Sequence, residues 1–242
     1  MRIDLYLVEK GFAPSRSKAK EYIDSGRVFL NGTPVKKAGL EVTGCEEIKV
    51  SDPDKFVSRA GRKLEAALDI FGIDVRGLTA LDLGASTGGF TDCLLQRGAK
   101  QVIALDVGRD QLDIRLREDT RVFVMENTNA RDIYPEDLPF LPDIVTTDLS
   151  FISQTLIYPA VARVLKKGYF ISLVKPQFEA GRENIGKGGI VKDKDGKIKK
   201  AVFEKIEKAA AENGFTLIKT APSPIVGGDG NTEYLALFER SV

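Results

Sequence analysis

The sequence predicts an α/β protein with a mostly parallel sheet of seven strands and a small α+β module before it. Two observations support this prediction. From Leu78 onward, short apolar segments alternate with segments of helical periodicity, as in parallel sheets with crossover helices. The preceding region instead combines two short helical patterns with a hairpin signal. A chain of 242 residues is long enough for such a module and one well-packed domain.

The amino-terminal module begins with two predicted helices. Leu5, Leu7 and Val8 supply the apolar side of the first helix, and Ser15 is a plausible N-cap for the second. The Asn31-Gly32 pair between two short apolar segments is a strong signal for a tight hairpin turn. We therefore expect two helices followed by a β-hairpin.

Positive charge is concentrated in this module. Residues 1–37 hold eight cations against four acids, whereas the whole chain has a net charge of only +1. Arg16, Lys18 and Lys20 lie at the start of the second helix, where the helix dipole disfavours cations. A local basic patch indicates a site for a polyanion. The alternative is an ordinary solvated face of charged residues.

Three parts are expected along the chain: the module over residues 1–50, a linker over 51–58 and the sheet domain over 59–242. The linker, "SDPDKFVS", is short and polar at first, and a proline interrupts it. Ser58 is expected to cap a helix whose apolar residues from Leu64 to Phe71 follow the helical period. Lys63 lies beside that apolar stripe.

Seven segments are expected to form the sheet. Five are expected to be consecutive parallel strands, and the last pair is expected to complete the sheet at its edge. In chain order they are 79–83 (TALDL), 101–106 (QVIALD), 121–126 (RVFVME), 143–148 (DIVTTD), 169–175 (YFISLVK), 215–220 (FTLIKT) and 233–239 (EYLALFE).

The loop after the first of these strands, "LDLGASTGGFTDCLL", is typical of nucleotide-binding folds. Gly84, Gly88 and Gly89 would let the backbone approach a ligand closely. Ser86 stands where a dinucleotide motif has its second glycine, and the lysine of a phosphate-binding loop is absent. The loop therefore favours a cofactor with adenosine but without phosphates, such as S-adenosylmethionine.

Two later strand ends could contact the same cofactor. Asp106 could accept hydrogen bonds from ribose hydroxyls, and Asn127 and Asn129 could contact an adenine edge. Turn formation is the alternative explanation for the two asparagines.

Charged residues end the central strands of the predicted sheet. Asp148 ends the fourth strand, Lys175 ends the fifth, and Glu233 begins the last. Ligands of open α/β sheets bind at the carboxyl ends of the strands. With Lys63, these residues form a Lys-Asp-Lys-Glu set that we expect on one rim of the sheet.

Composition excludes several classes of chemistry and location. The absence of histidine rules out Ser-His-Asp and Cys-His catalysis and removes the commonest metal ligand, and we expect no metal. Cys45 and Cys93 form neither a zinc spacing nor a disulfide framework, which fits a reducing cytoplasm. No apolar run approaches the length of a membrane span.

The module resembles, nearly throughout, the αL-type RNA-binding module of ribosomal proteins, pseudouridine synthases and tyrosyl-tRNA synthetases. The matching stretches are "RIDLYLVEKG", "SRSKAKEYIDSGRVFLNG" and "VKKAG". The resemblance implies contact with structured RNA. The residues that we expect to contact RNA in the whole chain are Arg2, Ser15, Arg16, Lys18, Lys20, Arg27, Asn31, Lys37, Arg59, Arg62, Arg182 and Lys187.

The chain also resembles, over essentially its full length, the TlyA proteins, historically called haemolysins, which are RNA 2′-O-methyltransferases with a catalytic part similar to the FtsJ methyltransferases. The motifs are "SRAGRKLEAAL", "LDLGASTGGFTDCLL", "TTDLSFIS", "LVKPQFEAG" and "GGIVKD". The resemblance implies a Rossmann-like class I methyltransferase sheet, S-adenosylmethionine as cofactor and a catalytic tetrad of Lys63, Asp148, Lys175 and Glu233. The expected cofactor contacts are Asp82, Gly84, Ala85, Ser86, Gly88, Gly89, Phe90, Asp106, Val107, Asn127, Asn129 and Asp148.

The tetrad suits this chemistry. A ribose hydroxyl is a poor nucleophile, and Lys175 could orient it and accept its proton. Asp148 and Glu233 would hold the two ammonium groups in place. Methylation at a cytosine carbon would need a nucleophilic cysteine, but Cys93 is expected inside a helix. Methylation of an exocyclic amine usually uses an Asp/Asn-Pro-Pro-aromatic loop, but the fourth strand ends "TDLSF".

The resemblance implies a cytidine of ribosomal RNA near the subunit interface as the target. Some members of the family modify both ribosomal subunits and some only the large one. The chain starts directly at the module and has no tail beyond its last strand, so we expect the short form and the large subunit. We also expect a monomer that works on ribosomal RNA or a ribosomal subunit.

Two other hypotheses remain at this point. The old family name suggests a membrane-active haemolysin, although no amphipathic or spanning segment supports it. A cofactor-binding RNA chaperone without turnover is the other. Residues 178–195 form a long glycine-rich segment that we expect to act as a flap over the substrate, with Arg182 and Lys187 near phosphates.

Overall fold

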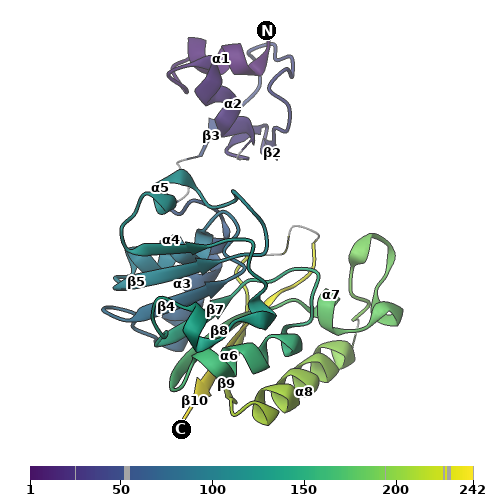
Figure 1. Ribbon diagram of the computed structural model, residues 1–242. Helices are drawn as coiled ribbons and strands as arrows, with labels where there is room; N and C mark the ends of the chain where they lie inside the picture. Colours follow the sequence, from purple (N-terminus) through teal and green to yellow (C-terminus); the bar gives the residue numbers. More distant parts are fainter. Residues whose placement is uncertain (25, 52–54, 194, 226, 228–229, 242) are drawn as a thin grey trace. The chain divides into compact units, whose positions relative to one another are not determined.

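The chain forms two compact units in the computed structural model, Met1–Lys55 and Phe56–Val242 (Figure 1). The structure describes residues 1–24, 26–51, 55–193, 195–225, 227 and 230–241. The second unit contains a seven-stranded, mostly parallel sheet, and the first is a small α+β unit, so the predicted fold class is confirmed. Residues 52–54 of the predicted linker lie outside the described residues.

The first unit consists of two helices and a small antiparallel sheet of order β2-β1-β3. Its elements are α1 (Ile3–Glu9), α2 (Arg16–Asp24), β1 (Val28–Leu30), β2 (Thr33–Pro34) and β3 (Ile48–Val50). The predicted turn joins β1 to β2, with positive φ angles of 48° at Asn31 and 77° at Gly32. The third strand was not predicted. Asn31 Oδ1 helps to hold the segment before it by accepting a hydrogen bond of 2.9 Å from the backbone of Glu47.

The core of this unit differs in one respect from the prediction. Ile3 and Leu7 are fully buried in α1, whereas Leu5 is 43% exposed. Residues four apart lie on one helix face, so Ile3 and Leu7 define the apolar stripe and Leu5 lies outside it. The predicted cap of α2 is confirmed, because Ser15 Oγ accepts a hydrogen bond of 3.2 Å from the backbone of Lys18.

The sheet of the second unit has the order β6-β5-β4-β7-β8-β10-β9. The strands β4 to β8 run parallel to one another, and β10 runs antiparallel to both β8 and β9. The bounds are β4 (Thr79–Leu83), β5 (Gln101–Leu105), β6 (Val122–Met125), β7 (Ile144–Thr147), β8 (Gly168–Val174), β9 (Thr216–Pro222) and β10 (Tyr234–Arg240).

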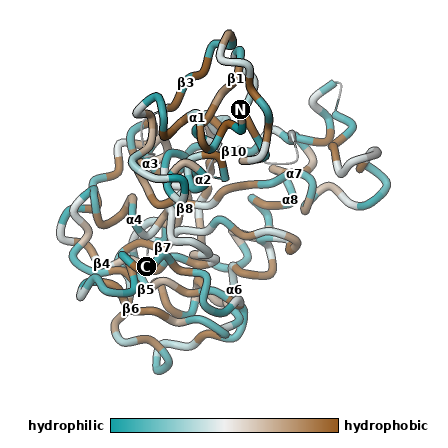
Figure 2. The backbone as a smooth tube through the Cα atoms, turned by 90° about the horizontal axis from the view of Figure 1, so that it is seen from above, coloured by the Kyte–Doolittle hydropathy of each residue, from teal (hydrophilic) through white to brown (hydrophobic). Residues whose placement is uncertain are grey.

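Helices cover both faces of this sheet and bury two apolar cores. Consecutive strand residues serve opposite faces: Ala80 packs in the core of α3 and α4, and Leu81 packs in the core of α6 and α8. In Figure 2 the sheet strands include brown, hydrophobic stretches. The helices are α3 (Ala60–Phe71), α4 (Gly89–Gln96), α5 (Ile114–Arg117), α6 (Tyr158–Val164), α7 (Pro176–Glu179) and α8 (Lys197–Glu212). Short 3₁₀ turns are Ala130–Asp132, Pro135–Asp137, Gln154–Leu156, Arg182–Asn184 and Lys187–Gly189.

The start of α3 differs from the prediction. Arg59, already in helical conformation, is the N-cap residue, and Ser58 contributes its backbone carbonyl, which accepts from Gly61 at 3.1 Å, rather than its side chain. Phe56 is 3% exposed and lies so close to Gly61 that a side chain there would collide with its ring. An aromatic side chain from the predicted linker therefore fixes the start of the helix. The predicted end at Gly72 is confirmed by its left-handed C-cap.

Nowhere in the described part of the chain does a helix have the length and apolar character needed to cross a membrane.

A buried carboxylate organises the first unit. Asp4 is 3% exposed and accepts two hydrogen bonds of 3.0 Å from Arg2 and one of 2.8 Å from Arg16. Burial alone would raise the pKa of the Asp4 carboxyl, but the hydrogen bonds and charges of the two arginines outweigh it and lower the pKa to about 2. Asp4 thus joins the start of α1 to the start of α2.

Asp4→Asn should loosen the first unit of the full-length protein, because the two arginines then face each other without a carboxylate. We expect the amides of α1 and α2 to exchange faster, equivalent to a loss of about 2 kcal/mol. Because the folded pKa of about 2 lies below the reference value of 3.8, the stabilisation is present above pH 3.8 and lost as the pH falls towards 2. Hydrogen exchange of these amides, measured at several pH values, reports this loss in the wild-type protein. The variant has no carboxylate at this position and should show no such loss. Equal exchange in Asp4→Asn and in the exposed control Asp24→Asn would contradict this role.

Candidate active site

The topology of the sheet brings three charged residues to one edge. Asp148 directly follows β7, and Lys175 directly follows the parallel neighbour β8. Glu233 directly precedes β10, whose first residue, Tyr234, pairs with Val174 at the end of β8. An antiparallel strand begins where its parallel neighbours end, so the three side chains share one rim.

Two ion pairs occupy this rim. Lys175 Nζ lies 2.7 Å from Asp148 Oδ1 and donates a hydrogen bond of 2.8 Å to Ser150 Oγ. Lys63, from α3, places its Nζ 2.5 Å from Glu233 Oε2. All four side chains are at most 16% exposed. Because a buried charge is costly without a partner, each carboxylate fixes the position of one ammonium group.

Three hollows meet at this rim. The β5 hollow, of about 500 Å³, is lined by residues that follow β5, β6 and β7. The glycine-loop hollow, of about 200 Å³, is lined by the loop after β4, and the arm hollow, of about 510 Å³, is lined by the segment after β8. Asp148 and Ser150 line both of the first two hollows, whereas Lys175 and Ser150 line both of the last two. Lys175 therefore lies at the junction between the glycine-loop hollow and the arm hollow.

The glycine loop divides into two groups of residues. Gly84, Ala85, Ser86 and Phe90 line the glycine-loop hollow. Gly88 and Gly89 line none of the three hollows.

These two glycines, expected to contact the cofactor, are instead required by packing. A Cβ at Gly88 would collide with Leu116 and lie 2.8 Å from Leu112, and its φ of 95° already disfavours a side chain. A Cβ at Gly89 would collide with the Ser58 hydroxyl and lie 2.9 Å from Ala60 in α3. A substitution at Gly88 would therefore damage the fold before it affected a ligand.

Of the residues predicted around an adenosine, Asp106, Val107 and Asn129 line the β5 hollow. The Asp106 carboxylate accepts hydrogen bonds from the backbone of Ser86 at 2.8 Å and of Gly108 at 2.7 Å.

The two predicted asparagines behave differently. Asn127 is exposed outside the hollows with a φ of 54°, which matches the alternative of turn formation. Asn129 caps a 3₁₀ turn by accepting from the backbone of Arg131 at 3.1 Å, although it remains at the wall of the β5 hollow.

Asp82, also expected at the cofactor, is fully buried and lines no hollow. Thr91 donates a hydrogen bond of 2.8 Å to one of its carboxylate oxygens, and Thr146 donates one of 3.1 Å to the other. Burial raises the pKa of the Asp82 carboxyl to about 7, against the effect of these two hydrogen bonds. Asp82 therefore links β4, β7 and α4 beneath the site and does not reach a ligand directly.

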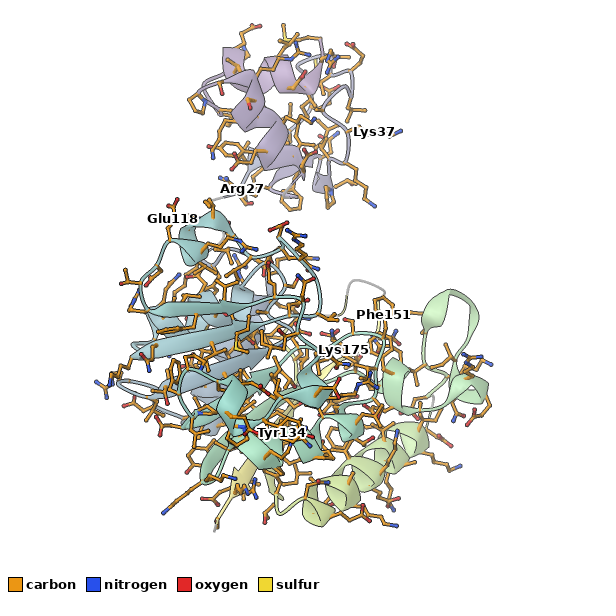
Figure 3. All side chains as sticks on the ribbon, viewed as in Figure 1. Arg27, Lys37, Glu118, Tyr134, Phe151 and Lys175 are labelled. Carbon is orange, nitrogen blue, oxygen red and sulfur yellow. The ribbon has the colours of Figure 1, made fainter. Side chains whose placement is uncertain are left out.

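The predicted RNA contacts of the first unit are partly engaged within the unit. Arg2 and Arg16 hold Asp4, and Lys18 pairs with Glu21 at 2.6 Å. The guanidinium of Arg27 lies 3.9 Å from the centre of the Tyr22 ring, and its Nε donates to the Ser51 carbonyl. The exposed members of the set are Arg2, Ser15, Arg16, Lys20, Asn31 and Lys37 (Figure 3 labels Arg27 and Lys37).

In the second unit, the predicted RNA contacts Arg59, Arg62 and Arg182 are exposed. Lys187 lies in a 3₁₀ turn, and its side chain is outside the described part of the structure.

Several wall residues were not predicted, and Phe151 is the most distinctive. It is 92% exposed, has a positive φ of 65° and lines both the β5 hollow and the arm hollow. Its ring centre lies 5.4 Å from that of Phe178, which also lines the arm hollow, and Figure 3 labels Phe151 and Lys175. An aromatic residue in the polar loop "TTDLSFIS" is the sequence signal that could have identified it. Ser150, which lines all three hollows, lacks such a signal.

Among the described residues, cysteine and acidic side chains nowhere form a group of three or more suited to a metal ion. The expectation of a metal-free site stays a prediction.

Comparison with known proteins relates both units to RNA methylation. The family of FtsJ-like methyltransferases matches residues 56–240, and the S4 domain matches residues 1–48. The 16S/23S rRNA (cytidine-2′-O)-methyltransferase TlyA of Mycobacterium tuberculosis is 42% identical and aligns over 96% of this chain and 87% of its own. The 23S rRNA (cytidine-2′-O)-methyltransferase TlyA of Campylobacter jejuni is 39% identical over 100% of both chains. A solved structure named putative hemolysin from Streptococcus thermophilus matches with a TM-score of 0.78 and 43% identity, over 100% of this chain and 88% of its own.

Asp82→Asn should change how stability depends on pH. The folded pKa of about 7 lies above the reference value of 3.8, so burying the charge costs progressively more as the pH rises from 3.8 to about 7. An amide stays neutral and can still bond with both threonines. The unfolding free energy of the variant relative to wild type should rise over this range, by at most about 1.4 kcal/mol per pH unit. Denaturant titrations of both proteins at several pH values measure this difference in unfolding free energy. A difference that stays constant with pH would contradict the raised pKa of Asp82.

Proposed function

The chain belongs to the TlyA group of the FtsJ-like methyltransferase family, and on this premise we propose that it methylates the ribose 2′-hydroxyl of a cytidine in ribosomal RNA, with S-adenosylmethionine as the methyl donor. One observation carries the proposal: Lys175, paired with Asp148, lies where the glycine-loop hollow meets the arm hollow. A group at such a junction can act on an acceptor that enters from one side and a donor bound on the other.

The β5 and glycine-loop hollows suit the donor. Together they form an elongated site, with Asp106 at one end and Ser86 and Asp148 shared between them. Each oxygen of Asp106 accepts one backbone hydrogen bond and keeps a lone pair that a ribose hydroxyl could use. S-adenosylmethionine supplies, when bound, a methyl group on a positively charged sulfur.

The two ion pairs suit the acceptor. In the proposed reaction, Lys175 first releases one ammonium proton to solvent, and its neutral amine then contacts and orients the ribose 2′-hydroxyl. The amine receives the hydroxyl proton as the 2′-oxygen bonds to the methyl group and the carbon–sulfur bond of the donor breaks, which leaves a neutral thioether. Asp148 holds Lys175 at this position, and Ser150 fixes the direction of its ammonium group. Glu233 holds Lys63 as a second cation at the arm hollow. Holding the hydroxyl and the methyl donor in line within a largely buried rim then contributes most of the rate enhancement.

The arm hollow suits the acceptor nucleotide. Its wall combines Lys63, Lys175 and Glu233 with the aromatic rings of Phe151 and Phe178. Aromatic rings stack on bases of single-stranded or flipped-out nucleotides. The match of residues 1–48 to an S4 domain, with exposed Lys20 and Lys37, supports binding of structured RNA by the first unit.

We propose a cytidine of 23S rRNA near the subunit interface as the main target. The relative from C. jejuni, which aligns over all of both chains, is named for 23S rRNA alone, whereas the relative from M. tuberculosis is named for both subunits. The experiment is to treat both unmodified rRNAs with the protein and labelled S-adenosylmethionine, and to map the product by mass spectrometry. We expect 2′-O-methylcytidine in 23S rRNA. A methyl group on a base, or no incorporation, would overturn the function, and a product in 16S rRNA would overturn only the subunit assignment.

Lys175→Ala should lower the rate of methyl transfer by about 10²–10⁴, because it removes the group that receives the proton. The affinities for cofactor and RNA should change little. Lys175→Arg should not restore activity, because a guanidinium stays protonated at working pH. Single-turnover rates with saturating RNA and cofactor measure both effects.

Lys205 is the matched structural control. Its Nζ donates to buried Glu179 at 2.9 Å, away from the three hollows. Lys205→Ala should lower stability rather than the rate, and Lys205→Arg should keep most of both. If Lys175→Arg behaves like Lys205→Arg, positive charge suffices and Lys175 does not accept the proton.

Phe151→Gly should separate stability from activity. The left-handed backbone at Phe151 costs about 1 kcal/mol that glycine does not incur, so the variant should be at least as stable as wild type. Loss of the exposed ring should nevertheless lower kcat/KM for RNA, because the ring can no longer stack on a base of the substrate. Thermal unfolding and kcat/KM for RNA test the two effects. Wild-type activity in Phe151→Gly would rule out a role for this ring.

A further inference from the structure

A small arm forms one wall of the arm hollow. Residues 184–192 fold back on themselves: Ile185 and Val191 form an antiparallel bridge, and the Gly186 backbone donates to the Ile190 carbonyl at 2.7 Å. Ile185 and Gly189 line the hollow. In Figure 1 the arm belongs to the light green segment between α7 and α8.

One side chain from another part of the chain holds this arm. Asn231 is 4% exposed, and its Oδ1 accepts a hydrogen bond of 2.9 Å from the backbone of Val191. Its Nδ2 donates a hydrogen bond of 2.9 Å to the carbonyl of Gly189. A single amide thus satisfies one donor and one acceptor of the arm, so both ends of the amide dipole are used.

The same short segment carries Glu233. Asn231 precedes Glu233 by two residues, and Glu233 pairs with Lys63 at the rim. The Glu233 carbonyl also accepts a hydrogen bond of 2.9 Å from Ser223, next to the end of β9. The position of the arm and the position of the Glu233–Lys63 pair are therefore fixed by neighbouring residues at the start of β10.

We propose that Asn231 is a positioning residue that latches the arm over the acceptor nucleotide and keeps the arm in register with Glu233. The inference rests on the proposed function for the identity of the acceptor, whereas the latch itself is a property of the free protein. The arm held in this position supplies Ile185 and Gly189 to the wall of the hollow in which the nucleotide would lie. Asn231 thereby acts on binding and alignment of the acceptor, not on the donor.

Two variants separate the parts of the latch. Asn231→Ala removes both hydrogen bonds. Asn231→Asp has nearly the same shape and can still accept from Val191, but it presents an oxygen to the Gly189 carbonyl, where no proton joins the two acceptors. Asn213→Ala is the matched control, because Asn213 Nδ2 also donates to a backbone carbonyl, that of Ala209 in α8, far along the chain from the arm.

The first readout is hydrogen exchange of the full-length protein without RNA. In Asn231→Ala and Asn231→Asp, amides of the arm should exchange on the order of tenfold faster, the equivalent of one or two lost hydrogen bonds. The central strands should keep wild-type protection. Unchanged exchange of the arm would overturn the latch, whatever the enzyme proves to methylate.

The second readout is the split between KM and kcat. Both Asn231 variants should raise KM for RNA by about tenfold and lower kcat less, with a change below twofold in the affinity for S-adenosylmethionine. Asn213→Ala should change neither. Faster exchange of the arm with an unchanged KM would show that the latch is structural only and overturn its role in acceptor binding. Absence of methyl transfer in the wild-type protein would instead count against the proposed function.

Discussion

Two lysine–carboxylate pairs at one rim of the sheet determine how the rest of the site is built. Burying an unpaired ammonium group costs several kcal/mol, so each lysine requires a carboxylate that approaches from a fixed direction. The order β7-β8-β10 supplies both partners: parallel strands bring Asp148 beside Lys175, and the antiparallel β10 brings in Glu233. The loop after β4, the loop after β7 and the arm then enclose these pairs and form the three hollows.

Much of this arrangement could be predicted because the relevant signals are local. Buried parallel strands appear as apolar runs, and their carboxyl ends share an edge, so Asp148 and Lys175 were expected together. The Asn31-Gly32 turn needs positive φ at both positions, which few residue pairs tolerate. The family resemblance is confirmed by the match to FtsJ-like methyltransferases and by relatives that align over nearly the whole chain.

Features that depend on distant packing could not be predicted. Gly88 belongs to a typical ligand loop, yet it faces Leu116 of α5 and Leu112 just before that helix. Asp82 stands beside that loop, yet its carboxyl points to Thr91 and Thr146 inside the protein. Asn231 contacts an arm about 40 residues earlier in the chain. A sequence motif gives the residue types near a ligand, but the direction of each side chain is set by what packs against it.

The most direct test of the central claim is a structure of the protein with S-adenosylhomocysteine and an RNA fragment that contains the acceptor cytidine. We expect the adenosine in the β5 hollow beside Asp106, the sulfur on the side of Gly84 and Ser86, and the ribose 2′-oxygen in the arm hollow within hydrogen-bond distance of Lys175 Nζ. A 2′-oxygen bound beyond the reach of Lys175, or a cofactor bound in the arm hollow, would contradict this role of Lys175.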